Sequence, residues 1–202
     1  HAGRSSRTGG LRRRGDREGA LRCFDEAEAV LRRLGSLNLL AEALSGRGNV
    51  LLDLGRREEA LRDVEAALEI QRKIGNRSGM GHALAGKASF LQAQGELAEA
   101  RVAAEEALAL VREMGERGAI AIRSYELATI CLDCGDDEAA DRLFEELAAA
   151  LPEAREGPSA ISASVCLAGW LAGRGREAEA LALLDRVVVL CEARGMLDME
   201  SE

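Results

Sequence analysis

Residues 55–75 read GRREEALRDVEAALEIQRKIG, which is nineteen residues without glycine or proline between two glycines. Apolar residues recur there at steps of three and four, at Ala60, Leu61, Val64, Ala67, Leu68 and Ile70. Charged residues fill most of the positions between them, as on the solvent side of an amphipathic helix. Glycine suits the left-handed conformation that commonly ends a helix. The stretch therefore predicts one helix with a glycine at each boundary.

The same pattern repeats along the chain with a period of forty residues. One glycine column comprises Gly15, Gly55, Gly95, Gly135 and Gly175. Five residues after each glycine stands an alanine, at Ala20, Ala60, Ala100, Ala140 and Ala180. A second glycine column lies half a period away at Gly35, Gly75, Gly115 and Gly195, with Arg155 as its gap. Each period therefore holds two helices, helix A before the Gly55 column and helix B after it.

The composition agrees with an all-α protein. Alanine, leucine, glutamate and arginine, which favour helices, dominate, whereas aromatic residues make up 2% of the 202 residues. A single hairpin cannot bury its apolar stripe, so the hairpins are expected to stack as one right-handed α-solenoid over residues 1–202. Its repeats are a partial one at 1–35, then 36–75, 76–115, 116–155 and 156–195, with 196–202 starting a further helix A.

The column of Phe24, Val64, Ala104, Phe144 and Leu184 is expected to fill the space between layers. Solenoid ends normally need polar caps, yet Val187, Val188, Val189 and Leu190 make the last helix B unusually apolar. Two interpretations remain: the sequence is a fragment of a larger protein, or its uncapped ends associate with other chains.

These columns resemble the tetratricopeptide repeat, which has small residues in helix A, a turn glycine, then alanine and a large apolar residue in helix B. Repeat 2 matches at Leu44, Gly48, Leu51, Gly55, Ala60, Val64 and Ala67, and repeat 4 at Ala128, Gly135, Ala140 and Phe144. The usual repeat has about 34 residues. The forty-residue period is similar to the long-helix type found in the adaptor Pins and in bacterial signalling proteins. The pattern departs from the family at Arg57 and Asp137, where an aromatic residue is usual.

The resemblance implies that helix A residues line a concave surface that holds a peptide or a protein domain. Carried over position by position, this partner-binding face comprises Glu42, Ser45, Asn49, His82, Ser89, Gln92, Tyr125 and Thr129. Repeat 5 contributes the smoother Val165, Gly169 and Ala172. The implied function is a non-enzymatic protein–protein interaction scaffold. The alternative is a sensory segment of a larger ATPase, protease or transcription regulator that contacts its own chain.

Charge limits the partners. Residues 1–14 carry five arginines and no acid, which is a charge of +5. Since the net charge of the chain is −8, the remaining residues carry a charge of −13. An acidic body argues against nucleic acid, and the basic start is either a contact arm or an ordinary disordered end.

Five scattered cysteines indicate reduced thiols in the cytoplasm. No apolar run is long enough to span a membrane, and no signal peptide is evident.

Motifs that carry chemistry have simpler explanations. Cys131 and Cys134 form one C-x-x-C pair without a second ligand pair, so a buried thiol is preferred to a zinc site. Residues 173–178, GRGREA, match a dinucleotide fingerprint by letters only, because Gly175 is a repeat glycine. His82 has no nucleophile or second histidine beside it. No catalytic, cofactor or metal site is predicted.

Residues 74–86, IGNRSGMGHALAG, place Asn76 as the N-cap of a helix and Gly79, Gly81 and Gly86 inside it. Each glycine costs about 1 kcal/mol against alanine there. Three such glycines predict close approach by a neighbouring helix or by a partner near His82.

Overall fold

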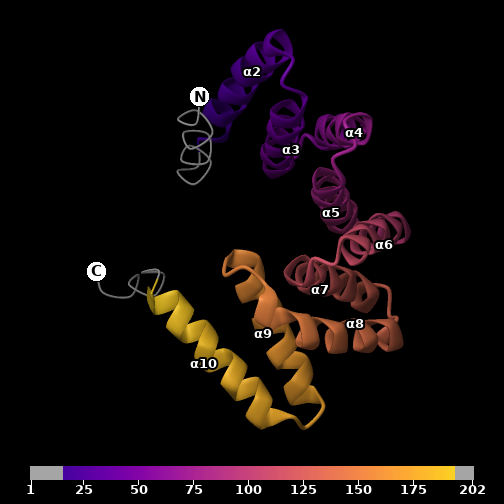
Figure 1. Ribbon diagram of the computed structural model, residues 1–202, viewed down its shortest axis with the longest axis vertical. Helices are drawn as coiled ribbons and strands as arrows, with labels where there is room; N and C mark the ends of the chain where they lie inside the picture. Colours follow the sequence, from indigo (N-terminus) through magenta and orange to yellow (C-terminus); the bar gives the residue numbers. More distant parts are fainter. Residues whose placement is uncertain (1–15, 194–202) are drawn as a thin grey trace. The chain divides into compact units, whose positions relative to one another are not determined.

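The computed structural model describes residues 16–193, and within them it contains α-helices, one short 3-10 helix and no strands. The segments 1–14 and 196–202, for which an arm and a further helix are expected, lie outside this range. The helices are α2 Arg17–Leu34, α3 Leu37–Asp53, α4 Arg57–Lys73, α5 Arg77–Gln94, α6 Leu97–Met114, α7 Arg117–Asp133, α8 Asp137–Ala150, η1 Leu151–Glu153, α9 Pro158–Gly173 and α10 Glu177–Ala193. The all-helical prediction is confirmed (Figure 1).

The glycine columns act as the sequence predicts. Each of the seven described column glycines has a positive φ, between 64° and 79°, and no other described residue does. Positive φ is strained for residues with a Cβ, so glycine fixes where one helix ends and the next begins. At the gap, Arg155, the helix ends differently: α8 stops at Ala150 and η1 follows.

Side chains cap the N-termini of α2, α5 and α8. Asn76 accepts a hydrogen bond from the Gly79 amide at 3.0 Å, which confirms its predicted capping role. Asp16 accepts from the Gly19 amide at 2.6 Å, and Asp136 accepts from the Ala139 amide at 3.1 Å. Each cap satisfies an amide that the helix itself leaves without a partner.

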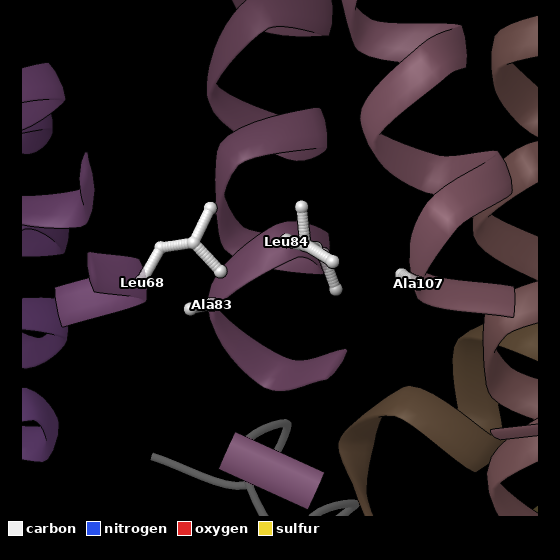
Figure 2. Packing of buried hydrophobic residues seen from close by; sticks show 5 residues of the cluster. Leu68, Ala83, Leu84 and Ala107 are labelled. Carbon is white, nitrogen blue, oxygen red and sulfur yellow. The ribbon is translucent and has the colours of Figure 1, made fainter. Parts of the chain in front are cut away.

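The described residues form two compact units, which divide within α6 between Leu110 and Val111. In the first unit, consecutive helices pack in pairs, and the neighbouring A helices α3 and α5 also touch. Ala83 and Leu84 of α5 lie between Leu68 of α4 and Ala107 of α6, all at most 5% exposed (Figure 2). In the second unit, α7 packs on α8 and α9 packs on α10, while α7 and α8 both contact α9.

The predicted core column is confirmed at Val64, Ala104 and Phe144, which are at most 4% exposed. It is wrong at Leu184, which is 37% exposed because no described helix follows α10. Phe24 is only half-buried. None of the helices within residues 16–193 is both long and apolar enough to cross a membrane.

Candidate binding surfaces

The predicted partner-binding residues fall on the A helices of both units. Glu42, Ser45 and Asn49 lie on α3, and His82, Ser89 and Gln92 lie on α5. Tyr125 and Thr129 lie on α7 of the second unit. Because α3 and α5 touch, the structure brings the two triplets of the first unit onto neighbouring helices. We call the surface of Glu42, Ser45, Asn49, His82, Ser89 and Gln92 the A-face.

Three A-face residues have uncommitted side chains. Asn49 and Ser89 are exposed and Ser45 is half-buried, and none of the three makes a side-chain hydrogen bond to the described part of the chain. Asn49 and Ser89 stand forty residues apart, so they occupy the same place in consecutive repeats. An amide and two hydroxyls offer both donors and acceptors, which suits the alternating groups of a peptide backbone.

Three other predicted residues, Glu42, His82 and Thr129, have hydrogen-bond partners within the chain. Glu42 accepts from Asn38 Nδ2 at 3.1 Å, and His82 Nδ1 lies 2.9 Å from the Ser78 carbonyl oxygen. Thr129 donates to the Glu126 carbonyl at 2.8 Å. Tyr125 is half-buried, and that burial, followed by the proximity of Cys166 and Glu126, raises the pKa of its hydroxyl.

A neighbouring helix approaches α5 closely at Gly79 but not at Gly86. At Gly79 a Cβ would collide with the carboxamide of Gln71, so glycine makes room for a neighbouring helix. At Gly86 a Cβ would meet nothing within 4 Å, so the chain itself does not require glycine there. Gly86 shares a helix face with His82 and Ser89 by their spacing.

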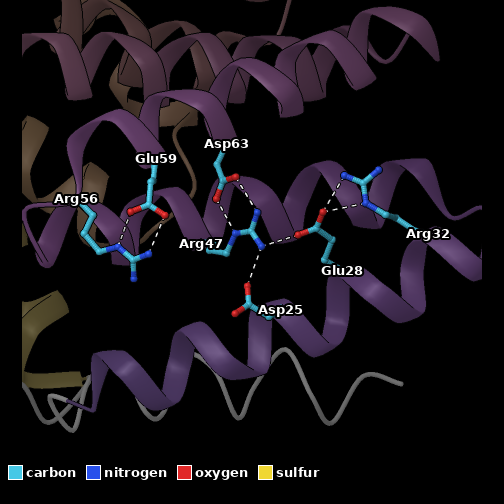
Figure 3. A network of polar contacts seen from close by, with 7 residues as sticks. All are labelled: Asp25, Glu28, Arg32, Arg47, Arg56, Glu59 and Asp63. Carbon is cyan, nitrogen blue, oxygen red and sulfur yellow. Dashed lines mark hydrogen bonds and ion pairs between the residues drawn. The ribbon is translucent and has the colours of Figure 1, made fainter.

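Sequence reasoning missed a second feature, an ionic network on the side of α3 that faces the B helices (Figure 3). Arg47 of α3 reaches Asp63 of α4 with two hydrogen bonds of 2.6 and 2.8 Å. It also donates to Asp25 at 2.8 Å and to Glu28 at 2.5 Å, both on α2. We call these four residues the Arg47 network. It holds three consecutive helices through one guanidinium.

The network is partly shielded from water. The side chains of Arg47, Glu28 and Asp63 are 18%, 19% and 11% exposed. Partial burial acts to raise the pKa of Glu28, but the hydrogen bond from Arg32 and the charge of Arg47 outweigh it and hold that pKa below its usual value. The hydrogen bond to Asp63 raises the pKa of Arg47, so the guanidinium stays charged.

A groove of about 480 Å³ runs over this network. Four acids and four arginines line it, at Asp25, Glu28, Glu59, Asp63, Arg32, Arg47, Arg56 and Arg62. Arg56 and Glu59 form a further bidentate pair, with both hydrogen bonds at 2.7 Å. Since the charges balance and are largely paired with one another, the groove is better suited to joining helices than to binding a charged ligand. The signal for it was present in the sequence: Glu28 and Asp63 occupy columns that are apolar in every later repeat.

A different contact joins the helices of the second unit. Trp170 of α9 stacks on Phe144 of α8, with ring centroids 5.4 Å apart, and donates to Asp141 at 2.7 Å. Arg174 also binds Asp141, and its guanidinium lies 5.4 Å from the centre of the Trp170 ring. Such cation–π contacts add to the apolar packing.

Family models match two parts of the chain. Residues 41–74 match a model described as tetratricopeptide repeat, and residues 82–114 match another with the same description. None of the curated proteins matches the sequence.

Solved structures share the fold at low identity. BtubC from P. vanneervenii has a TM-score of 0.74 and 18% identity, over 98% of this chain and 81% of its own. A Podosopora anserina kinesin light chain protein with nearly identical TPR-like repeats has a TM-score of 0.68 and 18% identity, over 96% of both chains. The Rap conjugation gene regulator of plasmid pLS20 has a TM-score of 0.70 and 17% identity, over 93% of this chain and 52% of its own, so this chain spans about half its length.

The helix pairs, the turn glycines and these likenesses agree on one architecture. Such an architecture is typical of scaffolds for interactions between proteins. The chain thus contains tetratricopeptide repeats, at residues 41–74 and 82–114, within an all-helical fold of TPR-like helix pairs.

Proposed function

We propose that the protein is an interaction scaffold that binds an extended peptide segment of another protein on the A-face of its first unit. The observation that carries this proposal is the pair Asn49 and Ser89. Both are exposed, stand one repeat apart on touching helices, and make no side-chain hydrogen bond to residues 16–193.

The geometry suits a peptide for a physical reason. A peptide in an extended conformation presents an amide and a carbonyl at regular intervals, and these need partners when a partner surface removes water from them. Asn49 can donate and accept at once, and Ser89 and Ser45 can each do either. Gly86 leaves open space on the same helix face as Ser89, where a backbone can approach α5 closely.

The fold neighbours support the same class of ligand. The Rap regulator of pLS20 was solved in complex with the Phr* peptide. The forty-residue period also supports placing these repeats with the long-helix type that is found in bacterial signalling proteins.

The test uses peptides selected from a displayed random library against the immobilised 202-residue chain. Affinities of the selected peptides are then measured by fluorescence anisotropy. The variant Asn49→Ala with Ser89→Ala is expected to weaken binding by about tenfold or more, because two hydrogen bonds of about 1 kcal/mol each are lost. Glu69→Ala, an exposed acid on helix α4, is the matched control and should bind as the unaltered protein does.

A further substitution tests the open space at Gly86. Gly86→Ala should stabilise α5 by up to about 1 kcal/mol. It should also weaken peptide binding, because the added methyl group fills the space through which the peptide backbone approaches α5. If the paired A-face variant binds every selected peptide with unchanged affinity, the peptide site lies elsewhere and the proposal is wrong.

A further inference from the structure

Helix α10 exposes an apolar face. Four large side chains on one side of this helix are open to solvent: Leu181 at 61%, Leu184 at 37%, Val188 at 47% and Val189 at 62%. Their spacing places Glu177, Asp185 and Glu192 on the same side, and all three are exposed. We call these seven residues the α10 outer face. An exposed apolar group of this kind commonly marks an interaction site.

The forty-residue period shows what covers the same positions elsewhere. Val64 and Leu68 of α4 stand 120 residues before Leu184 and Val188, and they are 4% and 5% exposed. Leu68 packs against Ala83 and Leu84 of α5, the next helix A. Phe144 of α8, forty residues before Leu184, is 1% exposed and stacks on Trp170 of α9, again the next helix A. The α10 outer face therefore has the form of a surface that receives a helix.

The charges show what kind of helix fits. Asp185 belongs to a column of acids, and three earlier members pair with a cation from the following repeat. The pairs are Asp25–Arg47 at 2.8 Å, Glu65–Lys87 at 3.2 Å and Glu145–Arg176 at 3.0 Å. The fourth, Glu105, pairs with Arg101 of its own helix at 2.9 Å.

Within residues 16–193, Asp185 has no ion pair, and neither do Glu177 and Glu192. The α10 outer face thus presents three acids and no cation among its apolar side chains. A helix that covers it gains electrostatic complementarity by carrying lysine or arginine beside its apolar stripe.

From these observations we propose that the α10 outer face docks a basic amphipathic helix of a partner protein. Its apolar stripe covers Leu184 and Val188, and one of its cations pairs with Asp185, as Lys87 of α5 pairs with Glu65. Two other occupants carry the wrong charge. A second copy docking through its own α10 would oppose like charges, and residues 194–202 contain three acids against one arginine.

The probe is a capped, fluorescein-labelled peptide with the sequence of residues 77–94. This sequence forms α5 within the chain, has Arg77 and Lys87, and contains no acid. Anisotropy with the full 202-residue chain is expected to show saturable binding. Val188→Asp should weaken it by about tenfold or more, because a carboxylate would be buried against the stripe. Circular dichroism and Trp170 fluorescence verify that each variant is folded.

Two controls locate the binding. Val102→Asp alters a valine of α6 that is 56% exposed, next to the place where α5 itself packs, and it should leave binding unchanged. A charge swap tests the ion pair. Asp185→Lys should weaken binding of the original peptide and strengthen binding of a peptide that carries Lys87→Glu.

The outcomes decide the proposal. Loss of binding in Val188→Asp together with recovery in the charge swap supports it. Absence of binding, equal binding by the unaltered chain and Val188→Asp, or loss of binding in Val102→Asp overturns it. Sedimentation that shows a dimer of the unaltered chain, dissolved by Val188→Asp, also overturns it, because the occupant is then a second copy.

Discussion

The helix triplet α2–α3–α4 and the triplet α8–α9–α10, which stands 120 residues later, solve one packing problem by opposite chemistry. In the first, Arg47 binds Glu28 and Asp63 across three helices. In the second, the equivalent positions hold Leu167, Ala148 and Leu183, and Leu167 is fully buried. In both triplets the turn between the last two helices is set by a column glycine, Gly55 in the first and Gly175 in the second. The same arrangement of three helices can therefore be filled with paired ions or with aliphatic side chains.

The largest effect is expected when the ionic residue is placed in the apolar triplet. Leu167→Arg would bury a guanidinium where the equivalents of Glu28 and Asp63 are aliphatic, so unfolding should become easier by about 4 kcal/mol or more. Urea denaturation followed by Trp170 fluorescence measures it, since this single tryptophan lies in the same triplet. A loss below about 1 kcal/mol would mean that the arginine reaches solvent and that the two triplets differ less than their burial suggests.

The reverse exchange is expected to have the next largest effect. Arg47→Leu leaves the carboxylates of Asp63 and Glu28 partly buried without their shared partner, and the expected loss is about 3 kcal/mol. The circular dichroism signal of the helices should show that the first unit unfolds at a lower urea concentration than in the unaltered protein. The Trp170 transition should move little, because repeat stability is largely local. Equal shifts in both signals would contradict this independence.

Acid is expected to destabilise the first triplet more than the second, by a smaller free energy than either exchange above. The pKa of Glu28 is lowered in the folded protein, so its contribution is present above the unfolded value of about 4.3 and is lost as the pH falls through the folded value. Glu28→Gln should therefore cost on the order of 1 kcal/mol at pH 7 and less at pH 3. Urea midpoints at the two pH values measure it; a cost that does not change with pH would show that the charge of Glu28 contributes nothing.

The smallest effect is expected when the whole network is exchanged. Glu28→Ala, Arg47→Leu and Asp63→Leu together install the residues of the later triplet. Replacing a buried ionic set by apolar groups is often neutral, so stability should stay within about 1 kcal/mol of the unaltered protein. The double variant that retains Asp63 is the control and should be clearly less stable. A triple variant as unstable as Arg47→Leu would show that the first triplet is shaped for ions.

The sequence predicts the helices well because their ends depend on local chemistry. Gly55 and Gly175 stand where a positive φ is needed. Asn76 caps α5 by accepting a hydrogen bond from the amide of Gly79, only three residues away. Core positions such as Ala60 follow from periodicity alone. These features need no knowledge of what lies across the interface.

The rest depends on contacts between distant residues. Acidic residues on a helix are usually solvated, so nothing local to Asp63 reveals that Arg47, sixteen residues away, reaches it. Leu184 matches its column in sequence, but burial requires a helix beyond α10. Gly86 and Gly79 are both glycines within one helix and look alike in the sequence, yet of the two only Gly79 has a side chain packed against it. The A-face remains a prediction, supported by the uncommitted side chains of Asn49 and Ser89.

The forward direction of the acid–cation pairs has a consequence for how such a chain can change by recombination. Asp25, Glu65 and Glu145 each depend on a cation encoded in the next forty-residue block. A block that is duplicated or moved alone carries its acid away from that cation and brings a cation to a new acid. The smallest segment that can be inherited with its ion pair intact is therefore two neighbouring blocks, although one block suffices to encode a hairpin.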